Sequence, residues 1–526
     1  MKKQVYIALL LASSIPAVAQ VPEDALRMGY YVPGGTARSQ AIGGAMTALG
    51  GDFSSLFINP AGLGFYKTSE VVLSPMFGFY NGKGSFRGTD ASATGFNKFS
   101  MGASGFVTSW YSPYSRWSNS SFALGINRTA NFNGVVHYKG QNDYSSYSEN
   151  MANEFFNYYV AQKGSNPGKP DDDIIQSALN DPAISLLTKM GLYTYLIDVE
   201  KQPNGSSKVV SRAELAGLLN QENTIKTTGG ITEVSMGLSA NMDDKLYIGG
   251  SIGLPIVQYN RVSTYRESDA NGRGNNEFAY SEYKEDYQSK GVGFNVKLGL
   301  IFKPVTQLRL GLAVHTPTFY GLRDKFSSTM TTDIDTATGS TKVFTANSAT
   351  FFNGADPYFK YNLTSPWRFM VGGAYVFNEV ADVTKQRGFI SADIEYVTYG
   401  SSKLKEADNS FPDNYFSQVN QVVKGEYKGA FNFRAGGEMK FNTLMTRLGF
   451  AYYGNPYKDA ALSSNRINIS GGIGYRDKGL FADLTYVYSM NKDVNFPYRV
   501  DAPRANTFAE TKQNNGTIIL TVGMKL

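Results

Sequence analysis

Apolar and polar residues alternate along most of the chain, a pattern that places successive side chains on opposite faces of β-strands. The C-terminal segment shows it clearly, because Ile518, Leu520, Val522, Met524 and Leu526 share one face. Residues 431–441 and 292–302 repeat the pattern with Phe, Val, Leu and Met on the apolar face. A two-residue repeat over so many segments predicts a protein built of β-strands.

The faces opposite these apolar stripes carry charged residues beside many small ones. The charged residues are Lys297, Arg309, Arg368, Asp393, Glu395, Arg434, Glu438, Arg447 and Asp483. In an exported soluble β-protein, which is the alternative, the apolar stripe would face a core. A polar face repeated on strand after strand is instead typical of the lumen of a membrane barrel, with lipid outside.

Segments of this kind predict fourteen strands. Their ranges are 69–80, 97–110, 120–138, 226–241, 245–266, 281–303, 307–332, 343–377, 388–400, 429–441, 443–455, 465–476, 479–491 and 512–526. The number is even, as in bacterial single-chain barrels, and Pro366 predicts an interruption in the eighth strand. We therefore predict an all-β fold, a 14-stranded antiparallel transmembrane β-barrel over residues 69–526.

Connector lengths predict the orientation of this barrel. The short connectors are 112–119, 243–244, 303–306, 442 and 476–478, and the long ones are 81–97, 139–225, 267–280, 401–428 and 492–511. Membrane barrels have short periplasmic turns and longer extracellular loops. Both ends of the mature chain are therefore expected on the periplasmic side.

Residues 139–225 change character and predict a helical extracellular loop. Residues 148–161 are expected to form one helix, the acidic run 171–173 to begin a second, and Asp181-Pro182 to begin a third. The candidate residues for capturing a ligand there are Phe155, Phe156, Tyr159, Ile184 and Leu187. The alternative is that these side chains pack the loop against itself.

Composition and the N-terminus indicate an exported protein. Residues 1–19 have Lys2 and Lys3, a short apolar core and the small-residue site Ala17-Val18-Ala19, as in a secretory signal peptide. A mean hydropathy of −0.27 excludes a polytopic helical membrane protein. The absence of Cys and the presence of only two His exclude thiolate and His-rich metal sites, so no cofactor is expected. Without Lys2 and Lys3 the net charge of +6 falls by two, which is too little for a nucleic-acid partner.

Residues 20–68 precede the first strand and are rich in glycine. Ala41–Asp52 is an Ala/Gly run ending in an acidic residue, and Asn59-Pro60-Ala61 follows just before the first strand. With Gly311–Pro317 and Ser365–Arg368, these features make the sequence similar to the FadL/TodX family of outer-membrane transporters of hydrophobic compounds. Taken alone, Asn59-Pro60 is an ordinary turn signal.

The resemblance implies passive uptake of hydrophobic compounds such as long-chain fatty acids across the outer membrane of a Gram-negative bacterium. Extracellular loops would capture the ligand, a hatch formed by residues 20–68 and marked by Asn59, Pro60 and Ala61 would move, and the ligand would leave sideways through the wall. The expected partners are outer-membrane lipids, the hydrophobic ligand and, through the C-terminal strand, the barrel-assembly machinery. We expect a monomer without enzymatic activity.

Three other functions compete with this interpretation. A haem receptor would need an axial ligand, for which His315 is the candidate. A general porin would need an open lumen, which residues 20–68 would obstruct. A barrel hydrolase would need His315 close to a nucleophile, but Ser327 and Ser328 lie too far along the strand.

Overall fold

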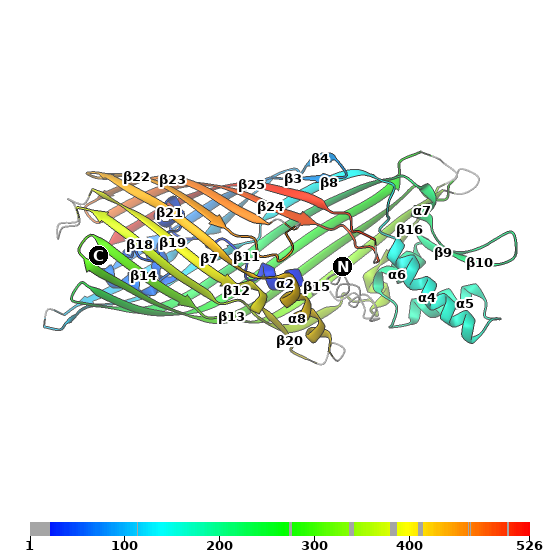
Figure 1. The fold of residues 1–526 in the computed structure, drawn as a ribbon, viewed down its shortest axis with the longest axis horizontal. Helices are drawn as coiled ribbons and strands as arrows, with labels where there is room; N and C mark the ends of the chain where they lie inside the picture. The colour runs from blue at the N-terminus through cyan, green and yellow to red at the C-terminus, as the bar shows by residue number, and fades with distance from the viewer. Residues whose placement is uncertain are drawn as a thin grey trace.

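The computed structural model describes residues 22–526 apart from 113, 273–275, 336–340, 379–386, 409–413, 461, 463 and 502–503. The expected signal peptide, residues 1–19, therefore lies outside the described residues. Across the described ranges the strands close into an antiparallel ring of fourteen, which confirms the predicted fold class. The ring is an elongated barrel with a helical structure at one end (Figure 1).

Several of the fourteen barrel strands are broken into shorter pieces. The first seven are β1, β2 and β3 (Glu70–Leu73, Pro75–Tyr80, Gly82–Phe86), β4, β5 and β6 (Thr89–Ser92, Phe96–Met101, Ser104–Tyr111), β7 and β8 (Trp117–Asn131, Gly134–Asn142), β11 (Leu219–Met242), β12 (Leu246–Asp269), β13 (Tyr280–Val305), and β14 and β15 (Leu308–His315, Phe319–Asp335). An additional strand, β16 (Thr341–Asn347), forms a hairpin with β15.

The other seven barrel strands complete the ring. They are β17 and β18 (Tyr358–Thr364, Arg368–Phe377), β19 and β20 (Gly388–Thr398, Lys403–Glu406), β21 (Gly429–Phe441), β22 (Leu444–Tyr453), β23 (Asn465–Asp477), β24 (Leu480–Asn495) and β25 (Ala509–Lys525). The ring closes where β25 pairs with the first barrel strand, with Glu70 opposite Lys525. In the described ranges most barrel strands pair with a neighbour on each side, which leaves little open edge, and β8 pairs on one side only.

Three neighbouring barrel strands break at the same level. The interruption predicted at Pro366 is present between β17 and β18, and residues 316–318 and 399–402 interrupt the strands on either side. Proline lacks an N–H and cannot donate to the ladder. Side-chain acceptors replace part of this backbone ladder, because Thr318 N donates to Ser365 Oγ (2.8 Å) and Trp367 N donates to Thr398 Oγ1 (3.1 Å).

The two faces of the wall differ in chemistry as predicted. Outward side chains are mostly apolar and exposed; Leu448, for example, is 74% exposed. All nine charged residues assigned to the lumen face are buried. The stacked pair Trp367 and Phe369 and the pair Tyr396 and Phe431 mark one edge of the apolar band. An apolar band with aromatic edges is typical of a wall that faces lipid.

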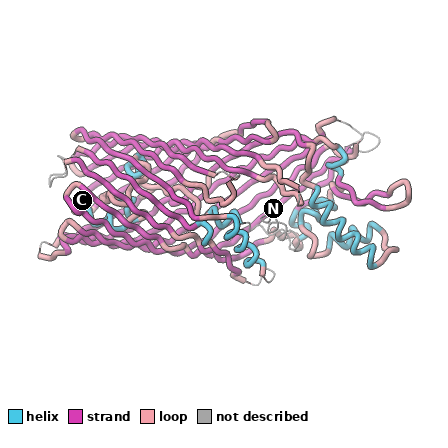
Figure 2. Tube along the Cα trace, in the orientation of Figure 1, coloured by secondary structure: helices cyan, strands magenta, loops and turns pink. Residues whose placement is uncertain are grey.

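Residues 143–218, between β8 and β11, form a helical cap. It contains α4 (Glu149–Ser165), α5 (Asp171–Asn180), α6 (Leu186–Tyr193) and α7 (Arg212–Ala216), with the small sheet of β9 (Ile197–Lys201) and β10 (Ser207–Ser211). Figure 2 shows these helices gathered at one end of the barrel. The three predicted helices are present, but the third begins at Leu186 and not at Asp181. Its start is set by Ser185, whose side chain accepts a hydrogen bond from Thr188 N.

Within the described ranges, no helix is long and apolar enough to cross a membrane.

Residues 22–66, which we call the N-terminal segment, have little regular structure. They contain α2 (Pro22–Arg27), α3 (Ala37–Ala41) and two short 3₁₀ helices, η1 (Phe53–Leu56) and η2 (Pro60–Phe65). The segment starts beside α8 (Tyr415–Glu426), which lies in the long connector after β20 (Figure 1). The prediction that both chain ends lie on the short-turn side is therefore wrong for the N-terminus, because Leu26 packs against Tyr415 and Phe416 in one apolar cluster on the long-connector side.

Candidate functional site

The N-terminal segment is hydrogen-bonded to the inner faces of strands around the ring. Thr485 donates to the carbonyl of Ala37 (2.7 Å), Ser470 donates to the carbonyl of Ala41 (3.1 Å), and Ser251 donates to the carbonyl of Leu56 (3.0 Å). The donors come from the neighbouring strands β23 and β24 and from β12 on another part of the ring. Most described residues of the segment are buried. Polar strand faces thus satisfy the backbone of an irregular segment that could not satisfy itself.

Asn59-Pro60-Ala61 joins this segment to the wall. Asn59 is fully buried; its Oδ1 accepts from Ala61 N (3.2 Å) and so caps η2, while Pro60 supplies the first helical position. The Asn59 Nδ2 donates to the carbonyl of Thr47 (2.6 Å) and lies 3.3 Å from the carbonyls of Leu300 and Leu312. The tripeptide is therefore both a turn and an anchor to β13 and β14.

Glycines on the inner face of the wall allow the segment to approach it closely. A Cβ on Gly299 would overlap Asn59 Oδ1, one on Gly311 would overlap the carbonyl of Thr47, and one on Gly449 would overlap the backbone at residues 41–43. In the sequence, Gly299 and Gly449 belong only to the small, polar lumen face, and Gly311 also begins the family-like run Gly311–Pro317. Their partners lie hundreds of residues away, and no local pattern could identify them.

Charged side chains between the segment and the wall are paired in buried groups. Glu395 contacts Arg368 (3.0 Å) and Arg434, and Asn432 donates to it at 2.9 Å. A second group joins Glu438 to Arg447 (2.6 Å) and to Arg38 of the N-terminal segment (3.2 Å). Burying charges is costly unless they are paired, and these pairs span neighbouring strands.

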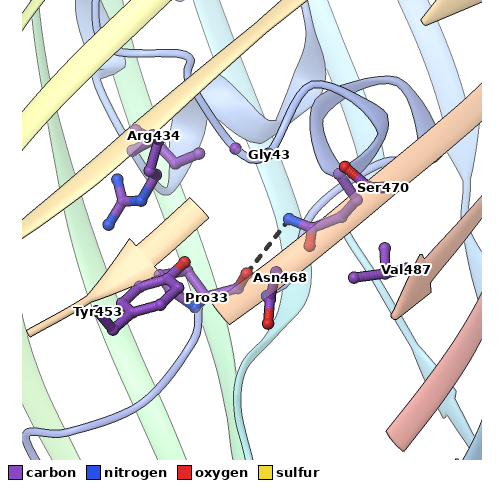
Figure 3. A pocket seen from close by; sticks show the side chains of 10 residues that line it. Pro33, Gly43, Arg434, Tyr453, Asn468, Ser470 and Val487 are labelled. Atoms are coloured by element: carbon purple, nitrogen blue, oxygen red, sulfur yellow. Dashed lines mark hydrogen bonds between the residues drawn. The ribbon is translucent and has the colours of Figure 1, made fainter. Parts of the chain in front are cut away.

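Two small cavities lie between the N-terminal segment and the wall. The smaller, of about 10 Å³, is lined by Pro33 and Gly43 of the segment and by Arg434, Tyr453, Asn468, Ser470 and Val487 of the wall (Figure 3). Gln40 closes one side by donating to the carbonyl of Pro33 (3.2 Å). The larger, of about 40 Å³, lies beside the break at Pro366 and contains Glu233, Lys297 and Arg368 in its lining. Each has room for little more than a few water molecules.

His315 lines the larger cavity, and its Nε2 lies 2.8 Å from the carbonyl of Ile58. A carbonyl only accepts hydrogen bonds, so Nε2 carries the proton in this contact. Nε2 therefore has no free lone pair for iron, and the cavity of about 40 Å³ that His315 lines is far too small for a haem. The contact favours the structural interpretation of His315 over the axial ligand of a haem.

The hydrogen-bonded ladder between the second and third barrel strands is interrupted, although Gly82 and Gly84 of β3 still lie close to Val135 and Tyr138 of β8. β6 and β7 pair as far as Ser104 and Ile126, after which β7 and then β8 pair with β11 on the other side. In the described part of the chain, no pairing joins β8 to β4 or β5. Asn127 and Thr129, directly beyond the last pair, line the larger cavity. Residues 132–133 separate β7 from β8, immediately before Gly134. The larger cavity therefore lies beside this interruption of the ladder.

The cap places the five capture candidates in two environments. Phe155, Tyr159 and Ile184 are buried in the cap's own apolar cluster, and Leu187 packs against its edge. Phe156 lies on the outside of α4 and is 51% exposed. The structure thus brings four of the candidates together as packing residues and leaves Phe156 facing solvent.

Asp171 fastens α5 to α4 and to β10. Lys163 Nζ lies 2.9 Å from its carboxylate, Tyr159 donates at 2.7 Å, and Ser207 donates at 2.6 Å. Burial opposes ionisation, but these three donors outweigh it and lower the pKa of Asp171 from 3.8 to about 2. Because the folded pKa is depressed, the contribution to stability is present above pH 3.8 and is lost as the pH falls towards 2.

We therefore expect amide exchange in α4 and α5 to accelerate as the pH falls from 3.8 to about 2, beyond the change in intrinsic exchange rate. Asp171→Asn should show the fast exchange at neutral pH. Asp172→Asn, one position along the same helix and exposed, is the matched control and should behave as the parent. Equal protection in the two variants would show that the ionised carboxylate does not hold the cap.

No family model matches the sequence, and no curated protein matches it. Among solved structures, the chain is similar to a FadL homologue of Pseudomonas aeruginosa, with 13% identity, a TM-score of 0.53, and coverage of 94% of this chain and 99% of that chain. It is also similar to the toluene transporter TodX of P. putida, with 14% identity, a TM-score of 0.45, and coverage of 95% and 99%. The first likeness confirms that the chain has the fold of a FadL homologue over nearly its whole length.

Proposed function

We propose that the protein lies in the outer membrane of a Gram-negative bacterium and takes up hydrophobic compounds by passive diffusion, with long-chain fatty acids as the substrate class. Its outward apolar band supports the membrane placement. The fold is shared with a FadL homologue, although at 13% identity. Partial closure of the lumen by the N-terminal segment supports selective uptake over a general porin.

The N-terminal segment acts as the hatch of this channel, and Asn59-Pro60-Ala61 anchors it. The observation that carries the proposal is the pair of Asn59 contacts with the carbonyls of Leu300 and Leu312 on neighbouring strands. A hatch needs contacts that hold it closed and can exchange with others when a ligand arrives. Hydrogen bonds to wall carbonyls, worth about 1 kcal/mol each, are of that strength.

Release is sideways, between the second and third barrel strands, where the ladder is interrupted. An amphiphile gains about 0.8 kcal/mol for each buried CH₂ group. Crossing the charged lumen beside Glu395 and Glu438 would forfeit that gain, whereas exit through the wall retains it. The larger cavity, which already reaches Asn127 and Thr129, marks the inner side of this route.

Native mass spectrometry of gently purified protein, with identification of bound lipids and haem, tests the substrate class. Co-purified fatty acids or similar amphiphiles are the expected result. Stoichiometric haem would replace the proposal with the haem receptor. If the protein is empty, planar-bilayer conductance decides between an open porin, which conducts steadily, and a closed channel.

Asn59→Ala tests the hatch. We expect fatty-acid uptake by cells that express the variant to fall severalfold, because η2 loses its cap and the segment loses its anchor on β13 and β14. The barrel should remain folded, with unchanged heat-dependent mobility on gels. Asn166→Ala, at the end of α4 in the cap, is the control for an Asn substitution outside the barrel. If Asn59→Ala takes up fatty acid as fast as the parent, Asn59-Pro60-Ala61 is only a turn and does not act in the hatch.

A further inference from the structure

Three cations lie side by side on the outward face of the wall. β15 pairs with β13 on one side and with β17 on the other, and the register places Lys290 opposite Arg323 and Arg323 opposite Lys360. All three are exposed and share the face of Phe319, which is 58% exposed. Directly opposed residues in a sheet have Cβ atoms only about 5 Å apart.

This row carries an electrostatic cost without a visible compensation. Like charges directly opposite one another destabilise a sheet. Within the described ranges, no carboxylate is ion-paired with Lys290, Arg323 or Lys360, although neighbouring Lys325 is paired with Asp356 (3.2 Å). Arg323 lies over the ring of Tyr358 at 4.2 Å, which orients the guanidinium but leaves its charge in place. An anion held between the side chains would remove the repulsion.

The position of the row relative to the apolar band indicates which anion is available. β20 extends the row, since Lys405 lies opposite Asn362 and Lys403 opposite Thr364. Along the eighth barrel strand, Trp367 at the aromatic edge follows Thr364 after only two residues. The cations therefore stand just beyond the edge of the lipid-facing band, on the side of the long connectors. That is the headgroup level of the outer leaflet.

We propose that this cationic row, formed by Lys290, Arg323, Lys360, Lys403 and Lys405, binds the phosphorylated headgroup of an outer-leaflet lipid. The planar guanidinium of Arg323 matches two phosphate oxygens, and the lysines supply point charges around them. The apolar band below accepts the acyl chains of the same lipid. The inference rests on the proposed membrane placement and is independent of the transported substrate.

The test uses the full-length protein in detergent, titrated with bis-phosphorylated lipid A and followed by native mass spectrometry. We expect Arg323→Gln/Lys360→Gln to weaken binding by about tenfold or more, as the loss of two cations at a charged lipid surface predicts. Lys245→Gln/Lys478→Gln removes two exposed cations from short turns at the other end and should bind as the parent does. Both variants should retain fatty-acid uptake, which separates this test from that of the transport proposal.

Two further arms distinguish a lipid site from a site for free phosphate and from a row of charges that binds nothing. Lipid A without its phosphates should bind at the level of the Arg323→Gln/Lys360→Gln variant, and inorganic phosphate alone should not displace intact lipid A. In lipid-free detergent, the variant should unfold at the same or a higher temperature than the parent, because the repulsion is relieved. Equal binding by the two variants, parental binding of the dephosphorylated lipid or displacement by inorganic phosphate would overturn the proposal.

Discussion

Gly449→Val should turn a closed barrel into a conducting one. Gly449 lies on the inner face of β22, where a Cβ would overlap the backbone of residues 41–43. Backbone atoms cannot move aside as the end of a flexible side chain can, so valine should displace this part of the N-terminal segment. We expect the single-channel conductance in planar bilayers to rise on the order of tenfold, because a barrel of this size without its filling holds water.

Gly373→Val is the matched control for that substitution. Gly373 lies on β18 with its Cβ direction open, since no atom comes within 4 Å of that position. The control should keep the low conductance, and both variants should keep the heat-dependent gel mobility of a folded barrel. If Gly449→Val stays folded and conducts no more than the control, the N-terminal segment does not seal the lumen.

Glu395→Leu should be the most destabilising single substitution that we consider. Glu395 is 2% exposed and stands between Arg368 and Arg434, both also buried. Removing the carboxylate takes the ion-pair partner away from two buried guanidinium groups, which costs about 3–5 kcal/mol in the free energy of unfolding. Urea unfolding of the protein in lipid vesicles measures this loss.

A compensated variant distinguishes lost pairing from lost packing. When a whole buried ionic group is replaced by apolar residues of similar volume, the net effect is small or even favourable. Glu395→Leu/Arg368→Met/Arg434→Met should therefore regain most of the stability lost by the single substitution. A triple variant that is no more stable than Glu395→Leu would mean that the site depends on shape rather than on charge.

Much of the barrel was predictable from the chain because alternation is a local property. The strand expected at 429–441 has those bounds in the structure, and the interruption expected at Pro366 is present. The neighbouring break at 316–318 was missed, although Pro317 was visible and gave the same signal. The break at 399–402 contains no proline; it lies beside the break at Pro366, since β18 pairs with β19 and β17 with β20.

The candidate site was predictable only in part, because its contacts join distant segments. Alternation assigned Asp393 and Glu395 to the lumen, but it could not show that Asp393 accepts from Thr47 Oγ1 (2.8 Å) or that Glu395 holds two arginines. Glu233 was overlooked, although a carboxylate on the same face as Ser235, Gly237 and Ser239 was a usable signal of a lumen position. Residue spacing also could not show that Phe155 packs inside the cap while Phe156, one residue later, faces solvent.

The length of the central strands determines how far the barrel wall extends beyond the lipid. β13 has 26 residues; at about 3.3 Å for each residue and a tilt of about 40°, it spans roughly 65 Å along the barrel axis. A lipid-facing band is only about 25 Å tall. More than half of the length of β13 therefore extends beyond the lipid, on the side that carries the cap. Antibodies, proteases and other large soluble probes can reach that wall from the side without entering the bilayer.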